Sequence, residues 1–263
     1  MNSIHQLKLK KEANKKISMV TCYDYWSSQI LAETDIDCLL VGDSVAMVVH
    51  GYPTTVHATV DMIATHTQAV KRGNPSCPIV ADLPFLAHRK GKKVLMSSVD
   101  TLMKAGADAI KIETFPGQES TVRYLTESGI PIVGHVGLTP QYVHQFGGYK
   151  VQGKTQEDFE QIKKHSIDLE KAGCHALVME CVPSVLAQEI TGVLKIPTIG
   201  IGAGIHCDGQ VLVLQDLLGL SKNFKPKFVR NFGQGESFLQ KAIQDFDESV
   251  KSATFPSENE TFQ

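Results

Sequence analysis

Short apolar runs alternate with longer, helix-compatible stretches along most of the chain. From Val99 onward, each helix-compatible stretch ends at or near a glycine, and an apolar run follows within a few residues. Glycine suits the left-handed position that ends a helix, and continuous aliphatic runs suit strands that are buried on both faces. Four glycines precede four such runs: Gly106 before 108–112, Gly129 before 130–133, Gly173 before 176–179 and Gly192 before 196–199. The alternation predicts a parallel α/β sheet.

The number of these units favours a closed barrel. Residues 17–21, 37–41 and 79–83 are three further runs of the same kind, and an eighth strand is expected near residues 210–214, although that run could also begin a helix. Seven or eight strand–helix units predict an α/β fold of the (β/α)8 TIM barrel type, with an open doubly wound sheet as the alternative. The glycines of residues 200–204 (GIGAG) lack the spacing of a dinucleotide-binding loop and are interpreted as a tight turn after the seventh strand.

Both ends of the chain are predicted to be helical. The basic residues 8–16 are interpreted as a solvated N-terminal helix. A terminal helix is expected from Phe238 to about Val250, before a polar tail over residues 252–263. No internal linker divides the chain, and 263 residues with 42% apolar side chains suffice for one continuous core. We therefore expect residues 1–263 to form a single barrel domain.

Composition and charge exclude several classes of protein. With 26 Lys plus Arg against 28 Asp plus Glu, the net charge is -2, so nucleic acid is not an expected partner. No apolar run is long enough for a signal peptide or a membrane helix. The six cysteines form no Cys-x-x-Cys pair, which argues against zinc sites and disulfides and favours a reducing, cytoplasmic setting with most thiols in the core.

Polar side chains stand where the predicted strands end. These residues are Tyr23, Asp24, Asp43, Ser44, Asp82, Lys111, Glu113, His135 and Glu180. In barrel enzymes the reactive groups come from the carboxyl ends of different strands, so these side chains should converge on one mouth. A single carboxylate there could equally be a helix cap or an ion-pair partner. Four carboxylates, however, would repel one another unless a cation such as Mg²⁺ compensates them.

Lys111, His135 and a glycine-rich stretch add to the predicted site. Lys111 and Glu113 are two residues apart, so both should face the barrel interior. A buried lysine needs a carboxylate or an anionic substrate to accept its charge. His135 has no second histidine at ligand spacing and is expected to be a hydrogen-bonded pocket residue. Residues 146–153 (FGGYKVQG) could be a mobile lid or an ordered turn.

Several segments, in order along the chain, closely resemble the ketopantoate hydroxymethyltransferase family. They are 21–25 (TCYDY), 40–44 (LVGDS), 81–85 (ADLPF), 104–108 (KAGAD), 134–141 (GHVGLTPQ), 146–153 (FGGYKVQG), 180–183 (ECVP) and 199–204 (IGIGAG). The likeness extends from about residue 17 to residue 256. Several independent motifs in the same order make this resemblance more specific than any single motif.

The resemblance implies a phosphoenolpyruvate-mutase-like barrel that catalyses the first step of pantothenate biosynthesis. In that reaction a hydroxymethyl group moves from 5,10-methylenetetrahydrofolate to 3-methyl-2-oxobutanoate, which gives 2-dehydropantoate (ketopantoate). The resemblance also implies a large homo-oligomer, often a decamer.

The family's site residues match this sequence position by position. The family's ligands for one Mg²⁺ fall on Asp43, Asp82 and Glu113. Its substrate contacts fall on Asp43, Ser44, Asp82 and Lys111, its pocket histidine on His135, and its catalytic base on Glu180.

This chemistry fits the polar residues, because a small 2-oxo acid can chelate one metal through its carboxylate and ketone oxygens. Mg²⁺ held by Asp43 and Asp82 would stabilise the enolate by roughly several kcal/mol. Lys111 would neutralise the developing charge, and Ser44 would hydrogen-bond the substrate carboxylate. Glu180 would take or relay the proton.

Two stretches beside these residues depart from the family pattern. Residues 86–89 (LAHR) stand where the family has a small Gly-Ser-Tyr-like stretch, and Thr114 and Phe115 stand where it has Gly-Gly. The added bulk could narrow the pocket, or it could change how Glu113 approaches the metal, so that a water lies between them in place of direct ligation.

Two other functions remain open at this point. The first is a lyase of the phosphoenolpyruvate-mutase and isocitrate-lyase kind, although the chain has no Lys-Lys-Cys-Gly-His loop. The second is a catalytically silent relative that binds a metabolite or contributes to an assembly. Against the silent relative stands the full set of polar groups at the mouth, since such groups are costly to bury.

Overall fold

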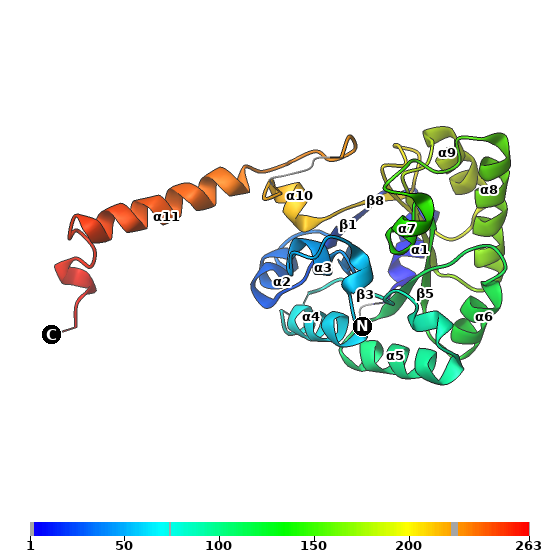
Figure 1. The fold of residues 1–263 in the computed structure, drawn as a ribbon, viewed down its shortest axis with the longest axis horizontal. Coiled ribbons are helices and arrows are strands. Elements are labelled where there is room, and N and C mark those ends of the chain that lie inside the picture. Colours follow the sequence, from blue (N-terminus) through cyan, green and yellow to red (C-terminus); the bar gives the residue numbers. More distant parts are fainter. Residues whose placement is uncertain (1–2, 74, 222–225, 263) are drawn as a thin grey trace. The chain divides into compact units, whose positions relative to one another are not determined.

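The computed structural model describes residues 3–73, 75–221 and 226–262 and contains a closed barrel of eight parallel strands (Figure 1). The strands pair in chain order, and β8 closes the barrel against β1 with Ile17 opposite Gly209. They are β1 (Ile17–Thr21), β2 (Cys38–Val41), β3 (Ile79–Asp82), β4 (Ala109–Glu113), β5 (Ile132–Gly137), β6 (Ala176–Glu180), β7 (Thr198–Ile201) and β8 (Gly209–Leu212). The predicted TIM barrel is confirmed, including its eighth strand, and the doubly wound alternative is excluded.

Helices follow most strands and surround the barrel (Figure 1). They are α1 (His5–Glu12), α2 (Tyr25–Ala32), α3 (Val45–Val48), α4 (Val60–Arg72), α5 (Lys92–Lys104), α6 (Glu119–Glu127), α7 (Val143–Phe146), α8 (Gln156–Lys171) and α9 (Ser184–Val193). Short 3₁₀ turns are η1 (Thr55–His57), η2 (Ala87–Arg89) and η3 (Pro140–Tyr142). No helix among the described residues is both long enough and apolar enough to cross a membrane.

The glycine signals located three of the four predicted helix ends. Gly106, Gly129 and Gly173 have φ values of 113°, 83° and 99°, in the left-handed region that favours glycine. The prediction was wrong for Gly192, which lies inside α9. That helix ends one residue later, where the backbone of Leu194 becomes extended.

Alternate strand residues fill the barrel interior. Ala109, Val133 and Val178 belong to one buried apolar cluster. Leu7 of α1 belongs to it as well and is only 1% exposed, so α1 closes the amino-terminal end of the barrel. Because side chains alternate along a strand, Lys111 and Glu113 share the inner face with Ala109, as predicted.

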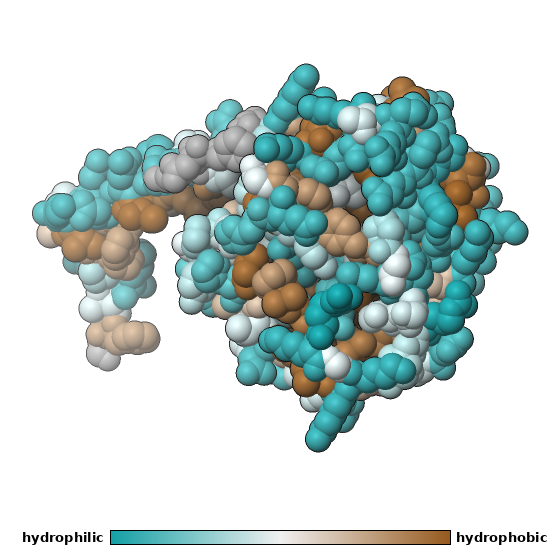
Figure 2. Space-filling view, turned by 45° about the vertical axis from the view of Figure 1, so that its right-hand side comes forward, coloured by the Kyte–Doolittle hydropathy of each residue, from teal (hydrophilic) through white to brown (hydrophobic). Residues whose placement is uncertain are grey.

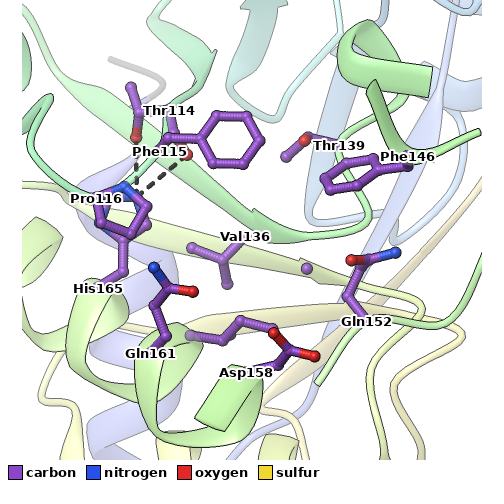
Figure 3. A pocket seen from close by; sticks show the side chains of 12 residues that line it. Thr114, Phe115, Pro116, Val136, Thr139, Phe146, Gln152, Asp158, Gln161 and His165 are labelled. Carbon is purple, nitrogen blue, oxygen red and sulfur yellow. Dashed lines mark hydrogen bonds between the residues drawn. The ribbon is translucent and has the colours of Figure 1, made fainter. Parts of the chain in front are cut away.

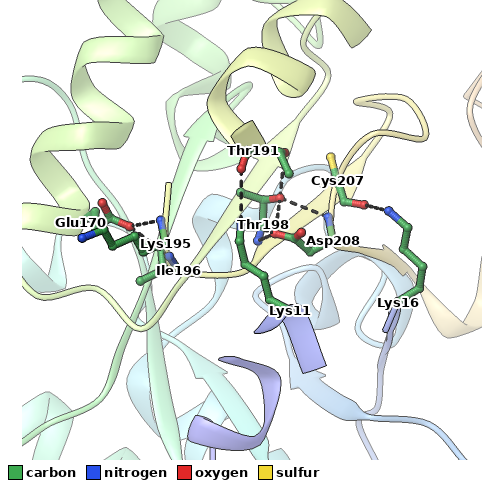
Figure 4. A network of polar contacts seen from close by, with 9 residues as sticks. All are labelled: Lys11, Lys16, Glu170, Thr191, Lys195, Ile196, Thr198, Cys207 and Asp208. Atoms are coloured by element: carbon green, nitrogen blue, oxygen red, sulfur yellow. Dashed lines mark hydrogen bonds and ion pairs between the residues drawn. The ribbon is translucent and has the colours of Figure 1, made fainter. Parts of the chain in front are cut away.

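A polar network joins α1 to the amino-terminal ends of β7 and β8 (Figure 4). Asp208 Oδ2 accepts hydrogen bonds from Lys11 Nζ at 2.8 Å and from Thr198 N at 2.9 Å. Lys16 Nζ donates to the carbonyl of Cys207 at 2.6 Å. The basic segment 8–16 is therefore not simply solvated, as the sequence suggested, because two of its lysines tie the chain to the bottom of the barrel. It also ends as a helix earlier, at Glu12, since Asn14 has a φ of 52°.

The chain divides into two compact units, residues 1–213 with the barrel and residues 214–263 with α10 (Leu214–Leu218), α11 (Gly235–Lys251) and the short turn η4 (Glu258–Glu260). The predicted terminal helix is confirmed by α11. None of its residues is buried, and one side carries exposed apolar side chains: Phe238, Leu239, Ile243, Phe246 and Val250. Figure 2 shows this hydrophobic surface along one side of the helix. That all 263 residues form one domain stays a prediction.

The cysteines behave as the sequence suggested. Five of the six are buried: Cys22, Cys38, Cys77, Cys174 and Cys207. In the described part of the chain no disulfide joins Cys22, Cys38, Cys174, Cys181 or Cys207.

Candidate active site

The carboxyl ends of neighbouring strands bring most of the predicted polar residues together. Asp43 follows β2, Asp82 ends β3, Lys111 and Glu113 lie in β4, His135 lies in β5 and Glu180 ends β6. The first five are at most 5% exposed, whereas the Glu180 side chain is 16% exposed. Glu180 is thus the acidic group of this set that a substrate entering the mouth can most readily reach.

Lys111 is the cation at the centre of the site. Its Nζ lies 3.0 Å from Asp82 Oδ1, 3.9 Å from Glu113 Oε1 and 3.3 Å from His135 Nδ1. Burial alone would lower the pKa of Lys111, but the carboxylates of Asp82, Glu113 and Asp43 outweigh that effect and raise it. The lysine therefore stays charged, as a buried lysine can only when acidic groups surround it.

Three buried carboxylates share this single cation. The backbone N–H of Asp43 donates to Asp82 Oδ2 at 2.9 Å, which holds the two aspartates side by side. Burial and the charges of Asp82 and Glu113 raise the pKa of Asp43, and burial raises the pKa of Glu113 to about 7. One lysine does not balance three negative charges, so the site favours a further cation or a proton.

His135 lies between two of the acidic groups. Its Nδ1 lies 3.3 Å from Glu113 Oε1, and its Nε2 lies 3.3 Å from Glu180 Oε2. Burial, together with the charge of Lys111, lowers the pKa of His135, so the ring is neutral. Burial raises the pKa of Glu180 above that of an ordinary glutamate. The neutral imidazole therefore lies beside Glu180 without neutralising its charge, and its Nε2 makes no well-aligned hydrogen bond among the described residues.

Ser44 is held by a residue from another strand end. The hydroxyls of Tyr23 and Ser44 are 2.7 Å apart, and Tyr23 is 1% exposed. Gly42 leaves room for this arrangement, because a Cβ there would lie 2.9 Å from Ser44 Oγ. Asp24, by contrast, caps α2 by accepting from the N–H of Ser27 at 2.9 Å, which is the structural role that any single strand-end carboxylate could have had.

Gln141 is a site residue that the sequence analysis did not single out. Its side-chain Nε2 donates to Asp43 Oδ2 at 2.8 Å and to the carbonyl of Leu83 at 3.0 Å, and its backbone N–H donates to Glu113 Oε2 at 3.1 Å. It is 2% exposed. The residue ends the quoted GHVGLTPQ segment, but a neutral side chain in a loop gave no chemical signal of its own.

The glycine-rich stretch lies beside the mouth. The hydroxyl of Tyr149 lies 3.7 Å from Met47 Sδ, and the backbone N–H of Gln152 donates to the carbonyl of Cys181 at 2.9 Å. Burial and the charges of Glu180 and Asp43 raise the pKa of the Tyr149 phenol. That this stretch moves as a lid stays a prediction.

Thr114 and Phe115, the two bulky residues that stand where the family has Gly-Gly, contact residues outside the carboxylate cluster. Strand alternation turns Thr114 outward, where its carbonyl lies 3.1 Å from His165 Nε2 (Figure 3). The ring of Phe115 packs edge-on against Tyr142, with centroids 4.4 Å apart. In the other departing stretch Leu86 has a φ of 60° and precedes η2, which buries His88.

The carboxylates of Asp43, Asp82 and Glu113 are chemically suited to bind a hard divalent cation. Asp82 Oδ1 and Glu113 Oε1 are buried beside Lys111 but accept no well-aligned hydrogen bond from the described residues, and carboxylate oxygens are the ligands that Mg²⁺ prefers. No group of three His, Cys, Asp or Glu within the described ranges has the spacing of a metal site.

Comparison with known proteins gives matches over the full chain. A family model described as ketopantoate hydroxymethyltransferase matches residues 1–258. The chain is 49% identical to the 3-methyl-2-oxobutanoate hydroxymethyltransferase of Bdellovibrio bacteriovorus over 262 residues, which cover 100% of both chains. It is 50% identical to the enzyme of the same name from Legionella pneumophila (strain Lens) over 260 residues, 98% of this chain and 99% of the relative.

Solved structures show the same barrel at low sequence identity. The phosphoenolpyruvate phosphomutase of Streptomyces platensis subsp. rosaceus has a TM-score of 0.64 at 11% identity, covering 96% of this chain and 88% of its own. A 2,3-dimethylmalate lyase of the PEP mutase/isocitrate lyase superfamily has a TM-score of 0.57 at 14% identity, covering 97% and 89%. The barrel is thus of the phosphoenolpyruvate-mutase-like kind.

Proposed function

Because the chain belongs to the ketopantoate hydroxymethyltransferase family, we propose that it moves a hydroxymethyl group from 5,10-methylenetetrahydrofolate to 3-methyl-2-oxobutanoate. The products are 2-dehydropantoate and tetrahydrofolate, and a water molecule supplies the new hydroxyl oxygen. The observation that carries the proposal is Glu180, a partly exposed carboxylate that lies 3.3 Å from His135 Nε2 beside a buried acidic cluster. Membership of this family also decides against the lyase alternative.

The chain's own residues account for substrate binding and proton transfer. Glu180 removes the proton from the carbon next to the ketone, and the ring of His135 lies 3.3 Å from its carboxylate. Lys111 balances the negative charge that develops on the substrate oxygens, and Ser44 donates a hydrogen bond to the substrate carboxylate. The carbon so activated forms a bond to the methylene carbon of the donor. The two C–N bonds of that methylene are replaced by this C–C bond and by a C–O bond to water, and the proton removed from the substrate and one proton of the water pass to the two folate nitrogens. Mg²⁺ bound by Asp43, Asp82 and Glu113 would supply Lewis-acid stabilisation of the same oxygens.

A direct assay tests this function. Purified protein is mixed with 3-methyl-2-oxobutanoate, Mg²⁺ and tetrahydrofolate that has been condensed with ¹³C-formaldehyde. Carbon NMR should show the label in the hydroxymethyl group of 2-dehydropantoate, at a rate well above that of the same mixture without protein. No labelled product above that background would rule the function out.

Gln141 should control how tightly the metal binds. Replacing it by leucine keeps most of its volume but removes the amide that donates to Asp43 Oδ2. Loss of a hydrogen bond to a ligating carboxylate typically weakens metal binding by about 10- to 100-fold. Titration with Mn²⁺, followed by electron paramagnetic resonance, should show this loss.

The matched control for Gln141→Leu is Gln156→Leu, at an exposed glutamine that bonds Glu160 within α8. It should bind Mn²⁺ as the wild type does. If Gln141→Leu lowered only the melting temperature and left Mn²⁺ binding unchanged, Gln141 would be a structural spacer and not a residue that positions the ligands.

We also propose a cytoplasmic homo-oligomer, with the decamer that the family resemblance implies as the expected size. The exposed apolar side of α11 supports this, because surfaces of that kind are normally covered in the assembled protein. In sedimentation velocity, the double variant Phe238→Asp/Ile243→Asp should give smaller species than the wild type, with unchanged circular dichroism of the barrel. A monomeric wild type, or a variant that sediments like it, would contradict the proposal.

A further inference from the structure

Tyr23 is a buried residue whose hydroxyl contacts a side chain of the proposed substrate site. It follows β1, is 1% exposed, and places its phenol oxygen 2.7 Å from Ser44 Oγ. Ser44 follows Asp43 after β2 and is partly exposed. Because the phenol has almost no exposed surface, it acts on a bound molecule through Ser44 and not by direct contact.

Ser44 stands at a position where a serine side chain normally caps a helix. It is the residue before α3, and a serine there usually accepts a hydrogen bond from the backbone N–H two or three residues later. The Ser44 side chain makes no such bond. The N–H groups of Ala46 and Met47 donate instead to the carbonyls of Asp43 and Ser44, at 3.0 and 2.9 Å. The helix therefore does not need the Ser44 hydroxyl, which contacts Tyr23.

Two further contacts fix Tyr23 in place. The side chain of Thr21 hydrogen-bonds the same phenol. His66 Nδ1, from α4, lies 2.5 Å from the backbone carbonyl of Tyr23, and because a carbonyl only accepts, this nitrogen donates. Burial raises the pKa of Tyr23, so the phenol keeps its proton and remains a donor. Both the main chain and the hydroxyl of Tyr23 are thus held where the phenol reaches Ser44.

The number of available protons sets the direction of these bonds when an acid is bound. A carboxylate only accepts hydrogen bonds, and Ser44 has a single hydroxyl proton. If that proton goes to the carboxylate, Ser44 Oγ accepts from Tyr23, and the phenol oxygen in turn accepts from Thr21. The three hydroxyls then form one chain of donors, and such chains strengthen each of their bonds.

We propose that Tyr23 is a positioning residue for the oxo acid, an assignment that rests on the proposed function and on its use of Ser44. By donating to Ser44 Oγ, Tyr23 directs the Ser44 proton towards the substrate carboxylate. Without the phenol, the Ser44 hydroxyl is free to rotate, and the substrate has to order it on binding. Tyr23 therefore raises the affinity for the carboxylate without touching it.

A double-mutant cycle tests whether Tyr23 acts through Ser44. Calorimetry measures the affinity for 3-methyl-2-oxobutanoate with Mg²⁺ present and folate absent. Ser44→Ala removes a hydrogen bond to a charged group and should weaken binding by about 10- to 100-fold, and Tyr23→Phe by about 3- to 10-fold. The double variant Tyr23→Phe/Ser44→Ala should match Ser44→Ala within about twofold, because without Ser44 the phenol has nothing to direct. Losses that multiply in the double variant would overturn the proposal.

Two controls separate this role from a purely structural one. Tyr25→Phe removes a phenol that is 48% exposed two residues further on, and it should bind the oxo acid within about twofold of the wild type. Tyr23→Phe should bind Mn²⁺ as the wild type does, since the acidic cluster is unchanged. A lower melting temperature with unchanged oxo-acid affinity would make the phenol a structural group. An equal loss of Mn²⁺ affinity would make it a support of the acidic cluster, and either result would overturn the proposal.

The outcomes for Tyr23 and for the proposed function can be told apart. If the wild type makes labelled 2-dehydropantoate but Tyr23→Phe binds the oxo acid as the wild type does, the role of Tyr23 is overturned and the function stands. If oxo-acid binding depends on Tyr23 through Ser44 but no product forms, the role of Tyr23 stands and the function fails. A wild type that neither binds the oxo acid nor forms product overturns both.

Discussion

Replacing Glu180 by glutamine is expected to lower kcat by about 10²- to 10⁴-fold, the usual contribution of a general base. The amide cannot accept the substrate proton, yet it keeps the size of the side chain beside His135 Nε2, which lies 3.3 Å from Glu180 Oε2. Binding of Mn²⁺ and of 3-methyl-2-oxobutanoate should therefore stay close to wild type. Steady-state kinetics and calorimetry measure the two effects separately.

The control for Glu180→Gln is Glu189→Gln, which removes a surface ion pair with Lys163 at 2.8 Å. Such exposed pairs contribute little, so its kcat should match the wild type. Wild-type kcat in Glu180→Gln would remove this residue from the mechanism. Equal losses of turnover and of oxo-acid binding would make Glu180 a binding residue and not the base.

The dependence of kcat/KM on pH should also identify Glu180 as the base. Burial raises the pKa of Glu180 above its ordinary value of 4.5. Because the base acts only when ionised, kcat/KM of the wild type should fall about tenfold per pH unit below that raised pKa. In Glu180→Gln this acid limb should be missing. An acid limb that persists in the variant would assign it to another group.

Lys111→Met is expected to have the largest effect on stability. Lys111 is 5% exposed and is the cation that faces Asp82 at 3.0 Å and Glu113 at 3.9 Å. Removing one partner of a buried ion pair typically costs about 3–5 kcal/mol, because the other charges stay buried and unbalanced. Urea unfolding without divalent metal should show this loss in the free energy of unfolding, together with a large loss of turnover.

The loss of folding stability in Lys111→Met should be larger at high pH than at low pH. The pKa of Glu113 is already raised from 4.5 to about 7 in the folded protein, and removing the lysine charge raises it further. The folded state then binds more protons than the unfolded state at acidic pH, so its stability rises as pH falls. The deficit relative to wild type should be larger at pH 8 than at pH 5.

An exposed lysine provides the control for Lys111→Met. Lys104 pairs with Asp100 on the surface of α5 at 2.8 Å, and Lys104→Met should change the free energy of unfolding by less than about 1 kcal/mol at either pH. A Lys111→Met variant as stable as the wild type at pH 8 would show that the carboxylates do not depend on Lys111 for compensation.

The barrel was predictable because its strands are buried on both faces and therefore read as continuous apolar runs. The strand-end positions of Asp43, Asp82, Glu113 and Glu180 followed from the same runs, since parallel strands place their carboxyl ends on one side. Gly192 misled the prediction because glycine also occurs inside helices, where sequence alone does not reveal φ.

Other features depend on contacts that are remote in sequence. Gln141 contacts Asp43 from 98 residues away, and a neutral amide carries no charge pattern that would mark it. The sequence suggested that Lys11 is solvated, because its partner Asp208 is 197 residues away along the chain.

Proton exchange at the substrate tests the central claim most directly. The methine signal of 3-methyl-2-oxobutanoate in deuterated water is followed by proton NMR with wild-type protein, with and without Mg²⁺ and with and without tetrahydrofolate. We predict loss of the methine signal that requires Mg²⁺ and is absent in Glu180→Gln. A methine signal that stays constant with wild-type protein when Mg²⁺ and tetrahydrofolate are both present would contradict proton abstraction at this site.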